Sequence, residues 1–367
     1  MNMRVVHINT NTDWGGGEYQ VLNLLKRLPE EGVETVLFAI PGGQLAGMAS
    51  DAGIDVRHLP GGAVGRITFL ARKSVLGMIR GHEIDLIHAH DSRALDIGTG
   101  VKAASGIPLV LSRRIASPVR ANFLSRAKYT AAKIDAVLAI SRTVKDVFTR
   151  TGAYPEEKVH VVVDGLDFVE VSKVKPVEGL REKYSAGRLV GGIGRLSVKK
   201  NWQFLVRTAH RMRERDIHWI IAGEGPCRGD LEALIKQLDL EDRIHLLGFR
   251  DDASSILKSL DVLFFPSIRE GASVTVREAM LMGVPVVAVD APAVVESLDG
   301  NGWLISDGDV EGAARAVAEA LEDGPPRRKI VERARESAVR RFPFDKTVEG
   351  TIEVYRKILA GRNSRQS

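Results

Sequence analysis

The segment SIREGASVTVREAMLMGVPVVAV (267–289) combines small residues with glutamates in the pattern best suited to chemistry in this sequence. A helix is predicted to begin near Ala272 or Ser273 and to be terminated by Gly283 and Pro285, since glycine and then proline are common after a helix. The first turn of such a helix has free backbone N–H groups and the positive end of the helix dipole, which suit a diphosphate. The residues expected to meet this diphosphate are Gly271, Ala272, Ser273 and Val274.

Two glutamates, Glu270 and Glu278, flank the predicted start of this helix. Glu278 lies about one turn inside it, where a carboxylate can accept two hydrogen bonds from the diol of a ribose. Residue chemistry alone leaves a second interpretation open. Glu278 would then be a surface residue, and Glu270 a carboxylate that stabilises the helix N-terminus.

Short apolar strands alternate with helices along the chain, and these elements must position the glutamates. In the first half, strands are predicted at RVVHIN (4–9), ETVLFAI (34–40), VRHL (56–59), DLIHAH (85–90), PLVLS (108–112) and AVLAIS (136–141). Apolar residues at helical spacing predict helices at about 15–32, 64–80, 92–104 and 120–133. Strands that alternate with helices indicate a parallel sheet with both faces covered.

The alternation stops near residue 163 and then restarts. In the second half, strands are predicted at RLVGGIGRL (188–196), HWIIAGEG (218–225), RIHLLGF (243–249), DVLFFPS (261–267) and PVVAVD (285–290). We predict two Rossmann-like, doubly wound α/β domains, at 1–168 and 187–345, joined by a linker at 169–186. Ligands of such sheets bind beyond the carboxyl ends of the strands, so the expected active site is an interdomain cleft.

The composition is that of an ordinary globular protein. The chain has 367 residues, of which 44% are apolar and 27% charged, which is enough for two domains. Its one cysteine, Cys227, excludes an intrachain disulfide and indicates a reducing compartment. We find no signal peptide and no stretch of the ~20 apolar residues that a membrane-spanning helix needs. We therefore expect a cytoplasmic protein whose only contact with a membrane is peripheral.

Positive charge is concentrated in two stretches of this chain, whose net charge is +5. The second stretch is PPRRKIVERARESAVRRF (325–342). Both could be solvated helix faces, or both could contact an anionic partner. The first stretch lies between Ile97 and Ile134, has no carboxylate, and contains Lys102, Arg113, Arg114, Arg120, Arg126, Lys128 and Lys133.

Residues 267–285 resemble the signature of glycosyltransferase family four, which has two glutamates separated by seven residues, an alanine–methionine pair and a glycine-x-proline. GRLSVKKN (194–201), IAGEGP (221–226) and LLGFRDD (246–252) resemble further blocks of that family, in the same order. The resemblance implies a role in donor binding for Gly194, Glu224, Gly225, Phe249, Arg250, Gly271, Ala272, Ser273, Val274 and Glu278.

The same resemblance implies that Arg195 and Lys200 are aimed at the donor diphosphate. Fixed cations are suited to that position, because a departing nucleoside diphosphate accumulates negative charge. Glu270 would orient the sugar near its 3- and 4-hydroxyls and steady positive charge at the anomeric carbon. Without the resemblance, the two cations could equally lie on the surface.

The first half of the chain also resembles the family. WGGGEYQVLNLL (14–25) resembles its glycine-rich first loop, where Gly16 and Gly17 would let donor phosphate and acceptor approach the backbone. HAHDS (88–92) resembles its histidine-containing loop, so that His90 would face the cleft as a catalytic residue. Taken alone, the glycine run would indicate a turn, and the histidine a structural residue.

The stretch LVLSRRIA (109–116) departs from the family pattern, in which a histidine often follows this strand. An arginine cannot replace a histidine as a base at neutral pH, because its pKa exceeds ~12. An arginine pair could instead hold a phosphate or carboxylate of the acceptor. We predict an acceptor site formed by Ser112, Arg113, Arg114 and Arg120.

The resemblance implies the GT-B fold, with a last helix at about 346–362 that packs back onto the first domain. It also implies retaining transfer of a sugar from a nucleoside diphosphate sugar to an acceptor hydroxyl. The leaving phosphate would take the acceptor proton, so we expect no metal and no cofactor. The first basic stretch favours a lipid-linked, lipopolysaccharide or polysaccharide acceptor at the inner face of the cell membrane.

Other classes of protein fit less well. A nicotinamide dehydrogenase needs a GxGxxG turn, which GGGE at 15–18 does not provide. A nucleotide-sugar epimerase of similar fold remains an alternative, although it needs paired acid and base groups. A non-catalytic sugar-binding protein would have little use for cations aimed at a leaving diphosphate. No recognised nucleic-acid-binding module appears.

Overall fold

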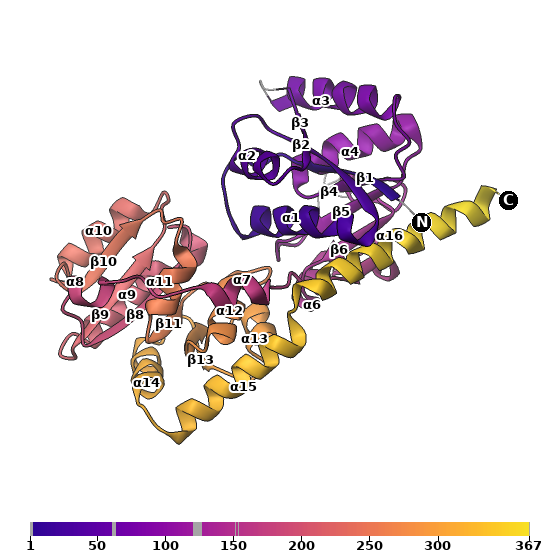
Figure 1. The fold of residues 1–367 in the computed structure, drawn as a ribbon. Helices are drawn as coiled ribbons and strands as arrows, with labels where there is room; N and C mark the ends of the chain where they lie inside the picture. Colours follow the sequence, from indigo (N-terminus) through magenta and orange to yellow (C-terminus); the bar gives the residue numbers. More distant parts are fainter. Residues whose placement is uncertain (1–2, 61–63, 120–126, 151, 153, 367) are drawn as a thin grey trace. The chain divides into compact units, whose positions relative to one another are not determined.

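The computed structural model describes residues 3–60, 64–119, 127–150, 152 and 154–366. The chain divides into two compact units, Met1–Gly165 with Asp345–Ser367, and Leu166–Phe344 (Figure 1). Each unit is built on one parallel sheet whose strands alternate with helices along the chain. The predicted α/β architecture of two doubly wound sheets is therefore confirmed.

The sheet of the first unit has seven strands in the order β3-β2-β1-β4-β5-β6-β7, all parallel. They are β1 (Met3–Asn9), β2 (Val33–Ala39), β3 (Asp55–His58), β4 (Leu86–Ala89), β5 (Leu109–Arg113), β6 (Ala136–Ala139) and β7 (Val159–Val161). The central strands are buried on both faces, which explains their unbroken apolar runs. The strand order reverses between β1 and β4, and ligands of doubly wound sheets bind beside such a switch point.

The helices of the first unit are α1 (Gly16–Arg27), α2 (Gln44–Asp51), α3 (Val64–Ile79), α4 (Ser92–Ser105), α6 (Arg142–Thr149) and α16 (Phe344–Gln366), with short 3-10 turns η1 (Leu28–Glu31) and η2 (Glu156–Lys158). Residues of α16 from Asp345 onward belong to this unit, although they lie at the other end of the chain. The backbone N–H groups at the start of α4 are capped by Asp91 and those of α6 by Ser141.

The sheet of the second unit has six parallel strands in the order β10-β9-β8-β11-β12-β13. They are β8 (Arg188–Ile193), β9 (Ile217–Ala222), β10 (Ile244–Gly248), β11 (Val262–Phe265), β12 (Val286–Val289) and β13 (Trp303–Ile305). Here the order reverses between β8 and β11. Trp219, Phe204 and Phe264 pack edge to face in the core between this sheet and α9.

The helices of the second unit are α7 (Phe168–Lys173), α8 (Leu180–Lys183), α9 (Trp202–Arg211), α10 (Arg228–Gln237), α11 (Ala253–Ser259), α12 (Val274–Met282), α13 (Pro292–Leu298), α14 (Val310–Leu321) and α15 (Pro325–Arg341), with a 3-10 turn η3 (Val198–Lys200). The segment 169–186, expected to be a linker, contains α8 and all of α7 except its first residue, and it is grouped with this unit. No helix in the described part of the chain is both long and apolar enough to cross a membrane.

Candidate active site

In the second unit, the loops after β8 and β11 lie on the two sides of the switch point and are bonded to each other. The backbone N–H of Ile268 donates to the carbonyl oxygen of Lys199 (3.1 Å), and the Ser267 hydroxyl oxygen lies 3.2 Å from the same oxygen. These bonds hold the loop that contains Glu270 against the loop that contains Lys200. Residues 70 positions apart in the sequence thus form one site, as the topology of a doubly wound sheet predicts.

Lys200 and Glu270 form the central contact of this site. The Lys200 Nζ lies 2.7 Å from Glu270 Oε1, and the Ser267 hydroxyl donates to the same carboxylate oxygen. Both charged side chains are mostly buried, with 17% and 13% of their surface exposed. Lys200 also lies 5.0 Å from the centre of the Phe265 ring. A lysine and a glutamate are therefore fixed side by side, with their charges compensated.

Glycines allow the loops after β8 and β9 to pack backbone to backbone. A Cβ atom at Gly223 would lie 2.1 Å from the Gly194 oxygen, and one at Gly225 would lie 2.3 Å from the Leu196 oxygen. The N–H of Leu196 donates to the carbonyl of Glu224 across this contact (2.9 Å). Larger residues at 223 or 225 would push the loops apart, so these glycines set the position of the segment that carries Arg195 and Lys200.

The start of α12 has an unsatisfied polar group. Ser273, the residue before the helix, is 2% exposed, and its hydroxyl has no hydrogen-bond partner among the described residues. Buried hydroxyls are normally paired, so an orphan at a helix N-terminus points to a ligand that would complete it. Glu278 lies in the second turn of the same helix. Burial raises the pKa of Glu278 to about 7, and a hydrogen bond from Ser254 opposes this rise.

The remaining residues predicted in this unit lie around the same edge of the sheet. Phe249 follows β10 and is 57% exposed, so its ring is accessible for stacking. Arg250 makes a two-pronged ion pair with Asp252, at 2.7 and 2.6 Å. Glu224 is paired with Arg228 at 2.6 Å. Arg195 is exposed, and its carbonyl accepts a bond from the Trp202 indole (3.1 Å).

In the first unit, three buried histidines meet at the switch point between β1 and β4. His7 Nδ1 lies 2.9 Å from His90 Nε2, and His88 lies between Tyr355 and Ser112, at 2.6 and 2.8 Å. Burial lowers the pKa of His7 to about 3. Burial, together with the charge of Arg114 and the neighbouring rings, holds the pKa of His88 and His90 well below the ordinary value. The cluster is therefore neutral at physiological pH.

The hydrogen bonds assign the protons of this cluster. Arg114 Nη1 lies 3.4 Å from His90 Nδ1, and a guanidinium can only donate, so the proton of His90 is on Nε2. His90 then donates to His7 Nδ1, which places the proton of His7 on Nε2. That atom is buried and has no partner among the described residues.

His7, His88 and His90 are the described residues whose spacing could suit a metal ion, since their ligand atoms lie within 4.8 Å of one another. Their arrangement does not fit a metal well. Both nitrogens of His88 are used by Tyr355 and Ser112, and His90 Nδ1 faces a guanidinium, whose charge opposes a cation. The cluster is better described as a hydrogen-bonded relay.

Arg114 connects the histidines to the glycine-rich loop. Its Nε lies 3.5 Å from Asp164 Oδ2, and its Cδ would lie 3.5 Å from a Cβ atom at Gly17. Gly16 and Gly17 form the first turn of α1, and the residue before them, Gly15, has no side chain to cap it. Free N–H groups, a guanidinium and His90 are thus gathered at one edge of this sheet, which is an arrangement suited to an anion.

Two family models match this chain. The model described as "Glycosyltransferase Family 4" matches residues 14–169, and the model described as "Glycosyl transferases group 1" matches residues 187–323. The two matches cover the glycine-rich loop, His88 and His90 of the histidine cluster, and the Lys200–Glu270 pair. The chain is a family four glycosyltransferase.

Curated relatives are also glycosyltransferases, and solved structures have the same fold. The lipopolysaccharide core biosynthesis glycosyltransferase LpsE of Rhizobium meliloti is 26% identical over 364 residues, which cover 98% of this chain and 100% of the relative. The D-inositol 3-phosphate glycosyltransferase of Salinispora tropica is 26% identical over 414 residues, covering 97% and 83%. The structure of Anabaena HepE in complex with UDP and glucose superposes with a TM-score of 0.84 at 22% identity, covering 97% and 100%. The fold is GT-B.

In the glycosyltransferase, two of the four predicted acceptor residues, Ser112 and Arg113, make contacts inside the first unit. Arg113 is buried between the Tyr129 and Phe148 rings, at 5.7 and 5.5 Å, and donates to the Ser117 carbonyl (2.6 Å). The Ser112 hydroxyl is bonded to His88 inside the histidine cluster. Arg113 therefore supports the loop after β5, and Ser112 orients a histidine. Arg120 lies outside the described residues.

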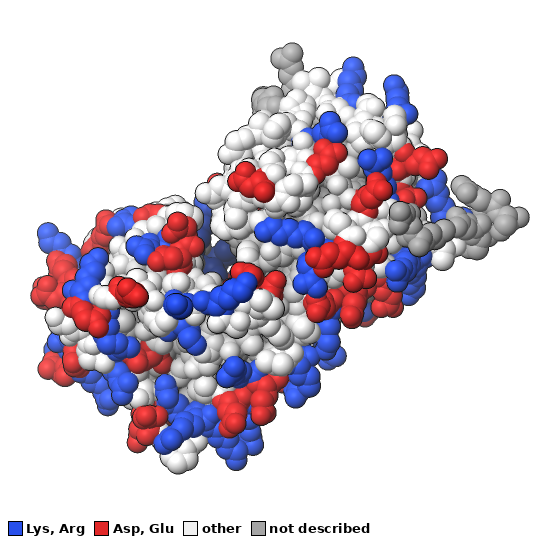
Figure 2. Space-filling model, in the orientation of Figure 1, with Lys and Arg blue, Asp and Glu red and all other residues white. Residues whose placement is uncertain are grey.

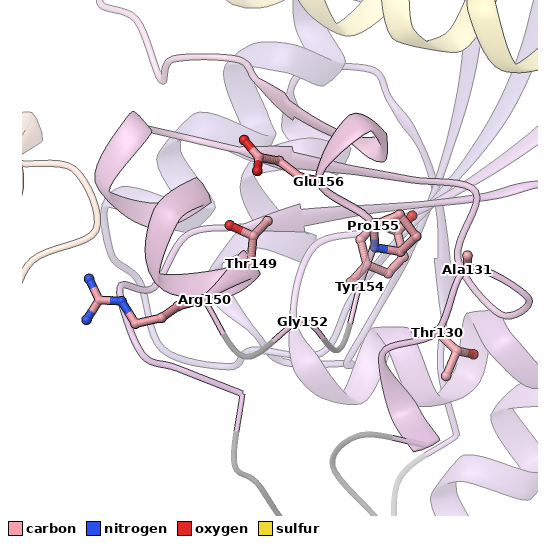
Figure 3. A pocket seen from close by; sticks show the side chains of 8 residues that line it. All are labelled: Thr130, Ala131, Thr149, Arg150, Gly152, Tyr154, Pro155 and Glu156. Carbon is pink, nitrogen blue, oxygen red and sulfur yellow. The ribbon is translucent and has the colours of Figure 1, made fainter.

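A hollow of about 680 Å³ in the first unit of the glycosyltransferase lies apart from these sites (Figure 3). Its lining residues precede β6 and β7 or lie at and just after the end of α6, so it lies at the amino ends of these strands. The Arg150 side chain extends away from the ring of Tyr154. The histidines and the Lys200–Glu270 pair belong to the carboxyl ends, so this hollow lies at the opposite end of the strands from the candidate site residues. It is lined by Thr130, Ala131, Thr149, Arg150, Gly152, Tyr154, Pro155 and Glu156.

Sequence reasoning missed Asp91, a residue that positions the site of the glycosyltransferase. Its carboxylate accepts bonds from the N–H and hydroxyl of Thr10, at 2.6 and 2.7 Å, and from the N–H groups of Arg93 and Ala94. It therefore caps α4 and ties the loop after β1 to the loop that contains His90. The signal in the sequence was the aspartate directly before a predicted helix, which is typical of an N-cap.

Proposed function

We propose that this enzyme transfers a sugar, with retention of configuration, from a nucleoside diphosphate sugar to an acceptor hydroxyl. The observation that carries the proposal is the Lys200–Glu270 pair, held beside the start of α12, where the buried Ser273 hydroxyl is unsatisfied. Lys200 and Arg195 would stabilise the leaving diphosphate, and Ser273 with the N–H groups of α12 would bind its oxygens. Glu270 would orient the sugar.

No metal is needed in this scheme, because lysine and arginine supply the positive charge that a divalent cation would otherwise provide. We propose a UDP-sugar as the first donor to test, since the Anabaena structure similar to this chain contains UDP and glucose. The exposed ring of Phe249 would stack on the base. Glu278 would accept hydrogen bonds from the ribose diol.

We propose that the first unit binds the acceptor through Arg114, which faces the glycine-rich loop, and that the acceptor carries an anionic group. The relative from Salinispora is named for a phosphate-bearing compound, and the relative from Rhizobium for the lipopolysaccharide core. The first name supports an acceptor that carries phosphate, and the second supports a part in lipopolysaccharide synthesis. Arg114 can bind such a group in two-pronged fashion.

A thermal-shift screen of UDP-, GDP- and ADP-sugars tests the donor, since a ligand at 100 times its Kd stabilises a protein by about 2.7 kcal/mol. We expect one nucleotide class to raise Tm, with or without EDTA. Ser273→Ala should lower the affinity for that nucleotide sugar by about 10- to 100-fold, because a hydrogen bond to a charged group is lost. The free variant should be at least as stable as the wild type, since an unsatisfied buried hydroxyl is removed.

Ser297→Ala is the matched control, because this buried serine in the same unit already donates to the Ala293 carbonyl (2.9 Å). It should lower stability and leave the ligand affinity unchanged. Three results would count against the donor site: no nucleotide sugar raises Tm, EDTA removes the shift, or Ser273→Ala binds as the wild type does.

The raised pKa of Glu278 predicts that donor affinity depends on pH. An ionised carboxylate can accept a hydrogen bond from each ribose hydroxyl. The affinity for the donor should therefore fall by up to about tenfold per pH unit as the pH drops below 7. Glu278→Gln should bind about tenfold more weakly at pH 8 and remove this dependence. Isothermal calorimetry with the nucleoside diphosphate measures both. If the variant keeps the wild-type pH profile, Glu278 does not bind the ribose.

The same substitution should stabilise the free enzyme. Because the folded-state pKa of Glu278 lies above its unfolded value, ionisation costs stability, and this cost grows between about pH 4.5 and pH 7 and stays constant above. At pH 8, Glu278→Gln should therefore raise the free energy of unfolding by on the order of 1–3 kcal/mol. The exposed Glu319, changed to Gln, is the control and should alter neither stability nor affinity.

A further inference from the structure

Helix α15 carries the entire net charge of the protein. Its 17 residues include seven of the chain's 52 Lys and Arg and two of its 47 Asp and Glu, so the rest of the chain holds 45 of each. In Figure 2, blue side chains with red ones among them line the lower rim of the face, where Figure 1 shows α15. The net charge of α15 is therefore +5, whereas the positive and negative charges of the remaining chain balance.

Cations at the two ends of α15 anchor the helix to its own unit. Arg327 donates to the Ala320 carbonyl (2.8 Å) and pairs with Asp323 (3.4 Å). Arg341 donates to the Ser297 carbonyl (3.1 Å) and pairs with Asp299 (3.4 Å). These arginines have a structural role, and the helix is held firmly by its buried side.

Four cations between these anchors project into solvent. Arg328, Lys329, Arg333 and Arg335 are exposed, and their side chains take part in no ion pair or hydrogen bond in the described part of the chain. By helix geometry, Arg328 and Arg335 lie on one side of the exposed face and Lys329 and Arg333 on the other, with Glu332 and Glu336 between them. The helix is about 25 Å long, so it presents two rows of cations on an extended surface.

The first basic stretch, between Ile97 and Ile134, was expected to contact the membrane, but its described cations bond to other residues of the first unit. Lys102 pairs with Asp135 (2.6 Å), and Lys128 pairs with Asp96 (2.8 Å). Arg113 is buried, Arg114 pairs with Asp164, and Lys133 donates to the Ala127 carbonyl. Among the described residues, these five cations are therefore held by contacts within their own unit, whereas the four of α15 project into solvent.

We infer that α15 is an electrostatic docking surface for an anionic lipid layer. The negative potential of such a surface attracts each cation held near it, and a fluid layer lets individual headgroups move to the cations. Nucleic acid fits less well, because α15 has no aromatic side chain on which a base could stack. The exposed face offers one large apolar side chain, Val339, so the helix lies on the headgroups and does not insert.

Flotation of the full chain with vesicles of phosphatidylcholine, with or without phosphatidylglycerol, tests this inference. We expect binding only to the anionic vesicles, at low salt and not at high salt. The quadruple variant Arg328→Gln, Lys329→Gln, Arg333→Gln, Arg335→Gln should need at least about tenfold more lipid for half-binding. Circular dichroism and Tm establish that the variant is folded, and its affinity for the nucleotide should be unchanged.

A matched variant separates position from net charge. Lys175, Arg207, Lys236 and Arg315 are exposed cations elsewhere on the same unit, and changing all four to Gln lowers the net charge by the same amount. This variant should keep the wild-type lipid affinity. Equal loss in both quadruple variants would overturn the inference, as would equal binding to neutral vesicles, or binding to RNA without binding to vesicles. The assay contains no sugar donor, so its result is independent of the proposed reaction.

Discussion

Lys200→Ala and Glu270→Ala should each lower kcat/KM for sugar transfer by about a hundredfold to a thousandfold, the usual cost of removing a fixed group that stabilises transition-state charge. The two side chains are in contact at 2.7 Å and mostly buried, so removal of one also leaves the other charge unpaired. For Lys200→Ala the loss should lie mainly in kcat, because charge on the leaving diphosphate develops in the transition state. Steady-state kinetics with donor and acceptor varied separately measure this division.

The Arg181–Asp261 pair is the matched control for this prediction. It lies in the same unit at 3.0 Å, but Asp261 precedes β11, at the amino ends of the strands. Arg181→Ala should change stability slightly and leave kcat unaltered. In the double variant of Lys200 and Glu270, the losses should be far from additive, since both groups act on the same bound donor. Near-native turnover in either single variant would contradict the proposed mechanism.

Much of the second unit could be predicted from the sequence because its signals are local. The start and end of α12 follow from Ser273 and Gly283, and the structure begins and ends this helix beside those residues. The contact between Lys200 and Glu270 could not be read from spacing, since 70 residues separate them. It follows only from the strand order, which brings the loop after β8 beside the loop after β11.

The first unit was harder to predict because its site depends on partners that are remote in the sequence. His7 lies 83 residues from His90, and Tyr355 lies 267 residues from His88, on a helix that returns from the other end of the chain. The different positions of Arg113, buried between two rings, and Arg114, beside the glycine-rich loop, could have been predicted from their local sequence. Neighbouring residues at the end of a strand point to opposite faces, so the two could not both face one ligand.

The basic stretches show why charge in a sequence does not locate a binding surface. The segment from Lys102 to Lys133 contains no carboxylate, yet Asp96 and Asp135 lie just outside it and pair with its lysines. Helix α15 contains two glutamates and still leaves four cations in solvent. Whether a cation is available depends on which residues the fold brings beside it, and that information is not local.

Acid should destabilise the first unit steeply, through the histidine cluster. Unfolded histidines bind protons near pH 6.5, whereas burial lowers the pKa of His7 to about 3 and keeps His88 and His90 low as well. The groups that face the cluster are Ser112, Arg114 and its partner Asp164, and Tyr355 of α16. The stabilising contribution of the three neutral histidines is complete above about pH 7 and is lost as the pH falls below 6.5.

Below about pH 6.5 the three histidines are neutral only in the folded state. The free energy of unfolding should then fall by up to about 4 kcal/mol for each unit by which the pH drops. Thermal unfolding by calorimetry between about pH 7.5 and pH 5 should show this slope in the transition of the first unit. His7→Asn can still accept the bond from His90 through its side-chain oxygen, so it should remove about one proton from the slope. His58→Asn, an exposed residue outside the cluster, should leave the slope unchanged. If His7→Asn and the wild type lose stability in parallel on acidification, His7 is protonated in the native state and the relay from Arg114 through His90 to His7 does not exist as described.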